Sequence, residues 1–218
     1  MNRYCFYVDG FNVYHALNDP LSYKPDLPHV QENKCFPYRK YKWLNYRKLA
    51  ESVIGSKDKV TGIFYFTAFV KWKPSQVIFR HKQYIKALRS QGVETIQGRF
   101  MKKYIMCHRC DREFLTHEEK RTDVNIALKL FCDAIDDLYD KAVIVSADSD
   151  LLPAIKTIRK YAPDKEIGVM FPIGRNSYDL RENSDFRRIM SEKLLRDSQF
   201  PDEVKVGNIT VKRPHSWH

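Results

Sequence analysis

Short apolar runs alternate along the chain with segments of helical periodicity. Runs at residues 60–70, 142–146 and 166–171 are rich in β-branched and aromatic residues, which is typical of buried strands. Residues 3–10 form a similar run that ends in the turn signal Asp-Gly, and residues 93–100 complete the set. The pattern therefore predicts about five strands.

The segments between these runs have the spacing of amphipathic helices. Residues 75–92 are predicted to form a helix that ends at Gly92, and residues 150–161 form another. A third helix is predicted over residues 122–138. The side chains expected on its inner face are Val124, Ala127, Leu128, Phe131, Ile135 and Leu138. Strands that alternate with helices indicate an α/β fold with right-handed βαβ units and a mostly parallel sheet covered on both faces.

Two insertions and a tail interrupt this alternation. Residues 19–42 contain four prolines and little periodicity, and residues 103–120 are polar around a pair of cysteines. A chain of 218 residues suits one domain better than two. We therefore expect a single domain over residues 1–190 with these two insertions. The tail, residues 191–218, has weaker periodicity and either docks on the domain or is mobile.

Composition and charge narrow the class of protein. Hydrophobic residues make up 43% and aromatic residues 13% of the chain, which excludes a largely disordered protein. No apolar run approaches the roughly 20 residues of a membrane span, and we expect no signal peptide. Lys and Arg outnumber Asp and Glu by 38 to 27, giving a net charge of +11, which favours nucleic acid over an anionic membrane surface as partner. The five cysteines indicate reduced thiols or a metal site in a cytoplasmic protein.

Aspartates follow the ends of two predicted strands. Asp9 comes directly after the first strand, Asp148 and Asp150 follow the fourth, and Asp123 begins the helix that leads to it. Ligands of open α/β sheets bind beyond the carboxyl ends of the strands, so we expect these carboxylates to converge. Their mutual repulsion would be relieved by a divalent cation such as Mg²⁺ or Mn²⁺. Such an ion would support hydrolysis of a phosphodiester bond.

Each aspartate also has an ordinary local explanation. Asp9 with Gly10 is a common turn pair, Asp123 suits a helix N-terminus, and Asp150 can cap the following helix. Joint placement at one edge of a sheet is harder to explain in this way. The combination therefore favours a functional site.

Four sequence motifs resemble a known family. The stretches YVDGFNVYHAL, EEKRTDVNIAL, VIVSADSDLLPAI and RNSYDLRENSDFRRI are similar to the successive motifs of the NYN domain, a branch of the PIN-like nuclease superfamily often called LabA-like in bacteria. The resemblance covers about residues 3–190, in the family's order and spacing. It implies a metal-dependent ribonuclease with a PIN-like three-layer α/β/α sandwich.

The resemblance also implies site residues. Ser146 fits the small polar position before the acidic pair, and Asp185 matches a late position that is frequently acidic. Ala147 stands where a glycine is common, and Arg121 with Thr122 replaces a small or apolar pair, which allows a changed loop geometry. The positions that match the family's catalytic and metal-binding motif are Asp9, Asn12, Asp123, Asp148 and Asp150.

The second insertion contains the sequence CHRC. Cys107 and Cys110 have the spacing of half a zinc knuckle. Tetrahedral zinc needs two more ligands. The alternative to a zinc site is a pair of free thiols in a polar loop. Further candidate ligands are Cys35, His117, His108 and His29. A zinc ion here would be structural and would hold the insertion beside the acidic site.

Aromatic and basic residues alternate in two segments that are candidates for binding RNA. Single-stranded nucleic acid is bound by aromatic platforms for the bases and cations for the backbone. The alternative is the edge of an aromatic core with lysine stems lying along it. The candidates are Arg39, Lys40, Lys42, Trp43, Lys71, Trp72, Lys73, Lys120 and Arg121.

The sequence thus favours a metal-dependent endoribonuclease that uses Mg²⁺ or Mn²⁺ and acts on single-stranded or structured RNA. Two alternatives stay open: an RNA-binding or regulatory module that does not cleave, and a DNA nuclease or phosphatase with the same acidic site. A homodimer is a further expectation.

Overall fold

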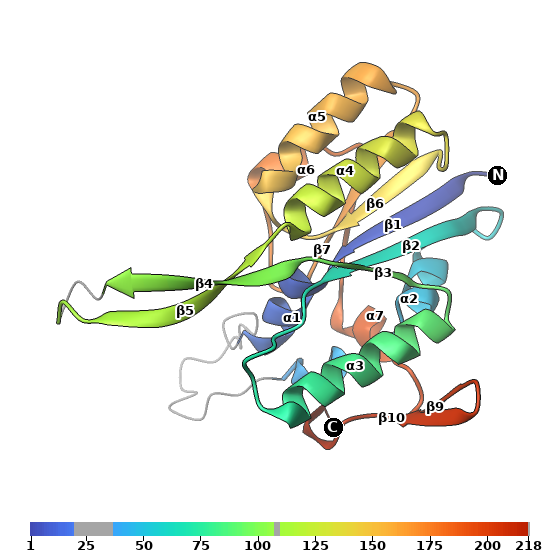
Figure 1. Cartoon of the computed structure of the whole chain (residues 1–218). Helices are drawn as coiled ribbons and strands as arrows, with labels where there is room; N and C mark the ends of the chain where they lie inside the picture. The colour runs from blue at the N-terminus through green and yellow to red at the C-terminus, as the bar shows by residue number, and fades with distance from the viewer. Residues whose placement is uncertain (20–36, 107–109, 218) are drawn as a thin grey trace, which may run out of the picture.

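A six-stranded sheet forms the centre of the computed structural model, which describes residues 1–19, 37–106 and 110–217 (Figure 1). The strand order is β3-β2-β1-β6-β7-β8, and all neighbouring strands are parallel. The strands are β1 (Arg3–Asp9), β2 (Lys59–Thr67), β3 (Glu94–Gln97), β6 (Lys141–Val145), β7 (Glu166–Phe171) and β8 (Phe186–Ile189). The predicted α/β class with a parallel sheet is therefore confirmed.

The central strands are continuous apolar runs because both of their faces are buried. In β1, Phe6 and Val8 point into one hydrophobic core, whereas Cys5 and Tyr7 point into the other. The sixth strand, β8, was not predicted. Apart from the half-buried Phe186, its residues are exposed, and an edge strand of this kind lacks the apolar pattern of a buried one.

Helices cover the two faces of the sheet and complete three layers (Figure 1). One face carries α4 (Thr122–Ile135), α5 (Leu152–Tyr161) and α6 (Tyr178–Asn183). The other carries α1 (Gly10–Asn18), α2 (Tyr46–Val53), α3 (Ser75–Ser90) and α7 (Glu192–Asp197). Within the described ranges, no helix combines the length and the apolar character that crossing a membrane requires.

The predicted inner face of α4 was wrong in part. Ala127 and Phe131 pack against the core, but the predicted inner residues Val124, Leu128, Ile135 and Leu138 are 47–60% exposed. The fully buried positions are Ile126 and Leu130. Apolar residues occupy more than one face of this helix, so periodicity alone did not identify the side that packs on the sheet.

The predicted strand at residues 93–100 is divided at Gly98. Its first part is β3, and its second part continues as β4 (Arg99–Met106), which pairs with β5 (Glu113–Lys120) in an antiparallel hairpin. This hairpin projects from the body of the protein (Figure 1). A Cβ atom at Gly98 would lie 2.9 Å from the backbone oxygen of Lys120, so glycine permits the close approach of the two strands at the base of the hairpin.

The segment after β8 packs on the face that α2 and α3 cover. It contains α7, the hairpin of β9 (Glu203–Val206) and β10 (Ile209–Lys212), and a terminal turn, η4 (His215–Trp217). The Trp217 ring lies 6.1 Å from that of Trp43 and 5.6 Å from that of Tyr84. Trp217 thus joins the core on the face that α3 covers.

Candidate active site at the carboxyl ends of β1 and β6

The order of the strands reverses between β1 and β6. The chain runs outward from β1 through β2 to β3, then returns to β6 on the other side of β1. Open α/β sheets bind ligands at such a switch point, beyond the carboxyl ends of the two strands. Asp9 is the last residue of β1, and Ser146, Ala147 and Asp148 follow directly after β6.

Asp9 is a buried carboxylate held by three hydrogen bonds. Its Oδ1 accepts from the backbone amides of Phe11 at 3.1 Å and Asn12 at 3.0 Å, which caps α1. Its Oδ2 accepts from Ser146 Oγ at 3.0 Å. Burial raises the pKa of Asp9, and the nearby charge of Asp148 adds to this rise, while the hydrogen bonds oppose it.

Gly10 allows this carboxylate to lie close to β2. A Cβ atom at position 10 would come within 2.5 Å of Tyr65 Cζ and 2.6 Å of the Phe66 carbonyl oxygen. The second of these is a backbone atom and cannot rotate away. The Asp9-Gly10 pair is therefore a tight strand-to-helix junction in the core rather than a surface turn.

Asn12 connects α1 to the loop after β6. Its Oδ1 accepts a hydrogen bond of 3.1 Å from the backbone amide of Ala147. In the same loop, the Asp148 amide donates to Ser146 Oγ at 3.1 Å. Asp148 Oδ1 in turn accepts from the amide of Asp150 at 3.0 Å and caps the short helix η3 (Ser149–Leu151). This network fixes both halves of the switch point.

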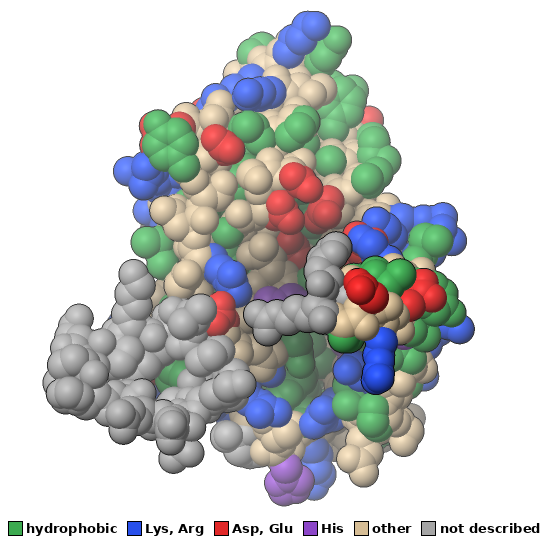
Figure 2. All heavy atoms as spheres, turned by 90° about the vertical axis from the view of Figure 1, so that its left-hand side faces the viewer, with side chains coloured by type: hydrophobic (Ala, Val, Ile, Leu, Met, Phe, Trp, Pro, Cys, Tyr) green, Lys and Arg blue, Asp and Glu red, His purple; other side chains and the backbone are tan. Residues whose placement is uncertain are grey.

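Asp123 at the start of α4 completes the acidic cluster. Burial raises the pKa of its carboxyl group to about 6, and the charges of Asp9, Asp148 and Asp150 contribute to the rise. The structure thus brings together the four aspartates predicted from the sequence. Figure 2 shows acidic side chains gathered at the centre of this face of the molecule, above a hollow.

Glu119 lies beside this cluster and was missed by sequence reasoning. It accepts a hydrogen bond from Thr122 Oγ1, and burial followed by the charge of Asp123 raises its pKa. Its position in the sequence could have suggested it, because Glu119 lies near the end of β5 and three residues before Thr122, where α4 begins. Sequence alone did not show that β5 points this carboxylate inward.

The cluster has the chemistry of a site for a hard cation but not a closed coordination shell. Among the described residues, no group of three or more His, Cys, Asp or Glu side chains is arranged to hold a metal ion. Clustered carboxylate oxygens are nevertheless the donors that Mg²⁺ and Mn²⁺ prefer. Burial is the main cause of the raised pKa values of Asp9 and Asp123, and neighbouring carboxylates add to it, so a cation would lower the cost of ionising these groups.

Asp185 does not belong to the cluster. Its carboxylate accepts from the backbone amide of Ile167 at 2.7 Å and from Arg159 at 2.8 Å. Ile167 is near the first residue of β7, so Asp185 lies at the opposite edge of the parallel sheet. The site assignment of Asp185 was therefore wrong.

The candidate RNA-binding residues divide into two groups. Trp43 is fully buried and donates from Nε1 to the Pro201 carbonyl oxygen at 2.8 Å, so its interpretation as a base platform was wrong. Lys42 belongs to the same buried group, because only 5% of its surface is exposed. Trp72 is 39% exposed and stacks on His117, with ring centroids 3.6 Å apart. The remaining candidates, all exposed, are Arg39, Lys40, Lys71, Lys73, Lys120 and Arg121.

The proposed zinc ligands are not brought together within the described part of the chain. Cys35 and Cys107, like His29 and His108, lie outside the described residues. Cys110 is exposed near the tip of the β4–β5 hairpin. His117 is four residues into β5 from Glu113, a span of about 14 Å in a strand. His117 therefore does not share an ion with Cys110, and its other predicted partners lie outside the described residues.

The fold and the acidic switch point define a parallel α/β protein of the PIN-like class. The family model of the NYN domain matches residues 4–192. The chain belongs to the NYN domain family, as its motifs predicted.

Two known proteins extend this comparison. The chain is 29% identical over 251 aligned positions to 6-hydroxy-3-succinoylpyridine 3-monooxygenase HspA of Pseudomonas putida, and the match covers 97% of this chain and 74% of that protein. A crystal structure of a Vibrio parahaemolyticus protein of unknown function is similar with a TM-score of 0.54 and 19% identity. That match covers 91% of this chain and 96% of the other, and it concerns the fold alone.

Proposed function

We propose that this protein is a metal-dependent endoribonuclease that hydrolyses RNA phosphodiester bonds. The observation that supports the proposal is the convergence of Asp9, Asp123, Asp148 and Asp150 at the switch point of the sheet, where Ser146 joins Asp9 to the loop of Asp148 and the other three charges act on Asp123. The four aspartates would hold Mg²⁺ or Mn²⁺. The bound ion would neutralise charge on the phosphate and lower the pKa of the attacking water.

The other residues of the site hold the carboxylates in place. Ser146 orients Asp9 and the loop that carries Asp148 through one hydroxyl group. Asn12 fixes the same loop through Ala147. Reacting groups that are held by a rigid surrounding network need little rearrangement during the reaction.

Cations and one aromatic stack beside the site provide a path for RNA. Lys71 and Lys73 flank Trp72, which stacks on His117 of the β4–β5 hairpin. Lys120 and Arg121 lie at the base of the hairpin, next to Asp123. Phosphate contacts by these cations would make RNA binding fall steeply as salt rises. The cytoplasm, where cellular RNA is abundant, is the proposed location.

The test is cleavage of a labelled single-stranded RNA in Mn²⁺, Mg²⁺ or EDTA, with Asp148→Asn compared to the native chain. Asp179→Asn, which changes an exposed aspartate on α6, is the matched control. We expect metal-dependent cutting that only Asp148→Asn loses. Cutting retained by Asp148→Asn at equal stability would contradict the proposal. Binding without cutting would favour the non-cleaving module, and cutting of DNA or a phosphate ester alone would favour the other alternative.

The Pseudomonas putida relative suggests a second candidate function. Its name describes a monooxygenase that acts on a small heteroaromatic acid. Such a reaction places one atom of dioxygen on the substrate and releases the other as water, with two electrons from an added reductant. The observation that favours it here is a cavity of about 580 Å³ beside the acidic cluster. Oxygen uptake with reduced nicotinamide and that acid would test it.

A further inference from the structure

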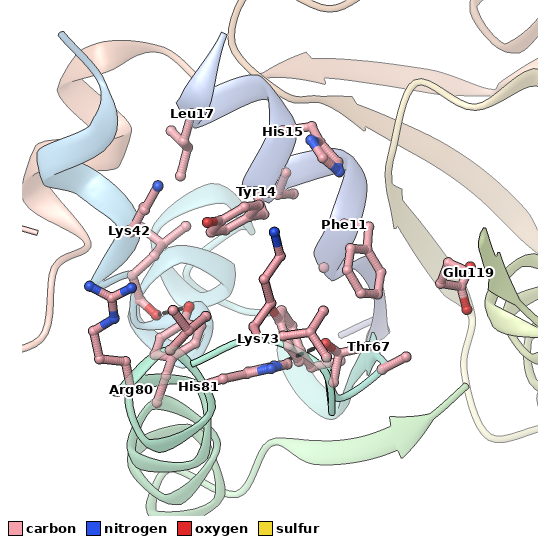
Figure 3. A pocket seen from close by; sticks show the side chains of 18 of the residues that line it. Phe11, Tyr14, His15, Leu17, Lys42, Thr67, Lys73, Arg80, His81 and Glu119 are labelled. Carbon is pink, nitrogen blue, oxygen red and sulfur yellow. Dashed lines mark hydrogen bonds between the residues drawn. The ribbon is translucent and has the colours of Figure 1, made fainter. Parts of the chain in front are cut away.

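A cavity of about 580 Å³ lies between α1, the carboxyl end of β2 and α3 (Figure 3). This volume is within the range of about 300–1,000 Å³ that is usual for small-molecule sites. Aromatic rings form much of its wall. They are contributed by Phe11, Tyr14, Tyr46, Tyr65, Tyr84 and Phe100.

Two cations lie at one end of the cavity without an acidic partner. Lys42 is 5% exposed, its Nζ donates to Asn18 Oδ1, and it lies 4.3 Å from the centre of the Tyr14 ring. Arg80 on α3 donates to Ser216 Oγ at 2.6 Å. Within the described ranges, neither forms an ion pair with a carboxylate. Figure 3 shows both side chains on the side of the cavity away from Glu119.

The electrostatics of this end favour an anion. Burial, together with the smaller effect of the charges of Arg39 and Arg80, lowers the pKa of Lys42 to about 7. A buried cation that faces other cations is unfavourable unless an anion compensates it. A carboxylate between Lys42 and Arg80 would supply that compensation and accept hydrogen bonds from both.

The rest of the cavity wall includes uncharged polar and aromatic side chains, and Glu119 lies at the end that adjoins the acidic cluster. Thr67 Oγ1 and His81 Nε2 are hydrogen-bonded at 3.1 Å. Burial lowers the pKa of His81 to about 4, so this imidazole is neutral at pH 7. Phe100 stands edge-on to Phe11, with 5.4 Å between the ring centroids. An aromatic ring can pack between such side chains in stacked or edge-to-face contact.

We propose that this cavity binds a small planar aromatic acid, with its carboxylate between Lys42 and Arg80 and its ring among the aromatic side chains. An RNA nucleotide fits less well, because its base is neutral and its phosphates would be drawn to any cation that the acidic cluster held. The inference rests on the second candidate function, for which it specifies how the ligand binds, and it is independent of RNA cleavage. The site places an aromatic ligand beside Asp9, since Gly10 and Phe11 form part of the cavity wall.

Titration calorimetry of the full chain in EDTA tests this site apart from any metal. The probes are 6-hydroxy-3-succinoylpyridine, its methyl ester and uridine 5′-monophosphate. Arg80→Gln and Lys73→Met each remove a cation from the cavity wall, and Arg89→Gln on the exposed side of α3 is the matched control. Because Lys73 is exposed, Lys73→Met is expected to fold like the native chain. It therefore allows the cavity to be tested even if Arg80→Gln is unstable.

We expect the acid to bind, the ester to bind at least tenfold more weakly, and Arg80→Gln to weaken acid binding at least tenfold. We expect a smaller loss in Lys73→Met and none in Arg89→Gln. Equal affinity for acid and ester would overturn the proposal, as would no acid binding at millimolar concentration. Tighter binding of the nucleotide than of the acid would also overturn it and assign the cavity to RNA.

Discussion

Ser146 donates a hydrogen bond of 3.0 Å from its hydroxyl group to Oδ2 of Asp9, although the two residues are 137 positions apart in the chain. The same oxygen of Ser146 accepts from the backbone amide of Asp148. One buried hydroxyl group therefore holds the carboxylate at the end of β1 and the loop that follows β6. Both halves of the acidic site depend on it.

Replacing Ser146 with alanine removes the donor to Asp9. A buried carboxylate that loses a hydrogen bond is harder to ionise, so the pKa of Asp9 should rise further. We expect Ser146→Ala to lower the free energy of unfolding by about 1–2 kcal/mol and to move the acidic limb of the cleavage profile to higher pH. Urea denaturation and rates between pH 5 and 8 would measure these effects. Ser149→Ala, at an exposed position three residues away, should change neither, and an unchanged profile in Ser146→Ala would contradict the prediction.

Replacing Asp123 with a neutral residue should raise the stability of the metal-free protein but weaken its binding of a metal ion. The pKa of Asp123 is raised to about 6 from about 3.9 in an unfolded chain. Its charge therefore destabilises the fold fully above pH 6 and not below about pH 4. We expect Asp123→Asn in EDTA to be more stable by about 1–2 kcal/mol at pH 7.5, with no gain at pH 4.

The same Asp123→Asn variant should respond less to a metal ion. A ligand that binds only the folded state raises the midpoint of thermal unfolding. Mn²⁺ is therefore expected to raise the melting temperature of the native chain and of Asp179→Asn, but to raise that of Asp123→Asn much less. An equal rise in all three proteins would exclude Asp123 from the metal site.

Gly10→Ala tests the close junction between β1 and α1. The added methyl group would meet the Phe66 carbonyl oxygen at 2.6 Å, so α1 must move and take the amides that hold Asp9 with it. We expect a loss of stability of about 1–3 kcal/mol and a loss of cleavage larger than in other variants of equal stability. Gly55→Ala, whose new methyl group would meet only the Asp58 side chain, is the control. Full activity in Gly10→Ala would show that this junction is not needed.

Sequence predicted the acidic site better than its surroundings, for physical reasons. Asp9 and Asp148 follow runs that are buried on both faces, so their position at one edge of a parallel sheet follows from the pattern. Trp43 and Trp72 both stand among basic residues, yet only Trp72 is exposed. Local pattern could not separate them, because Trp43 is buried by contacts from Phe200 and Trp217, more than 150 positions away.

The same limit explains why the cavity was not foreseen. Lys42 lies in the short turn η2 (Arg39–Lys42) and Arg80 in α3, two segments with no shared motif, and only the tertiary fold brings them to one cavity. Lys42 was grouped with exposed residues for RNA because its neighbours Arg39 and Lys40 are basic. Burial of a lysine is rare, so no sequence rule would favour it.

Lys42 should lower the stability of the protein in a way that depends on pH. Its pKa is about 7 in the folded chain and about 10.4 in the unfolded chain. Between these values the unfolded chain binds more protons, so stability rises with pH. The destabilisation is therefore complete below pH 7 and disappears above about pH 10.4. The groups that face Lys42 are Asn18, Tyr14, His15, Arg39 and Arg80.

We therefore expect Lys42→Met, which keeps the stem and removes the charge, to unfold at higher urea than the native chain at pH 6. The difference should be about 1–3 kcal/mol after allowance for the lost hydrogen bond to Asn18, and it should narrow by roughly half at pH 9. Lys48→Met on the exposed side of α2 should show neither effect. A difference that widened as the pH rose would mean that the folded chain stabilises the charged form of Lys42. The proposed anion site would then lack the uncompensated cation on which it rests.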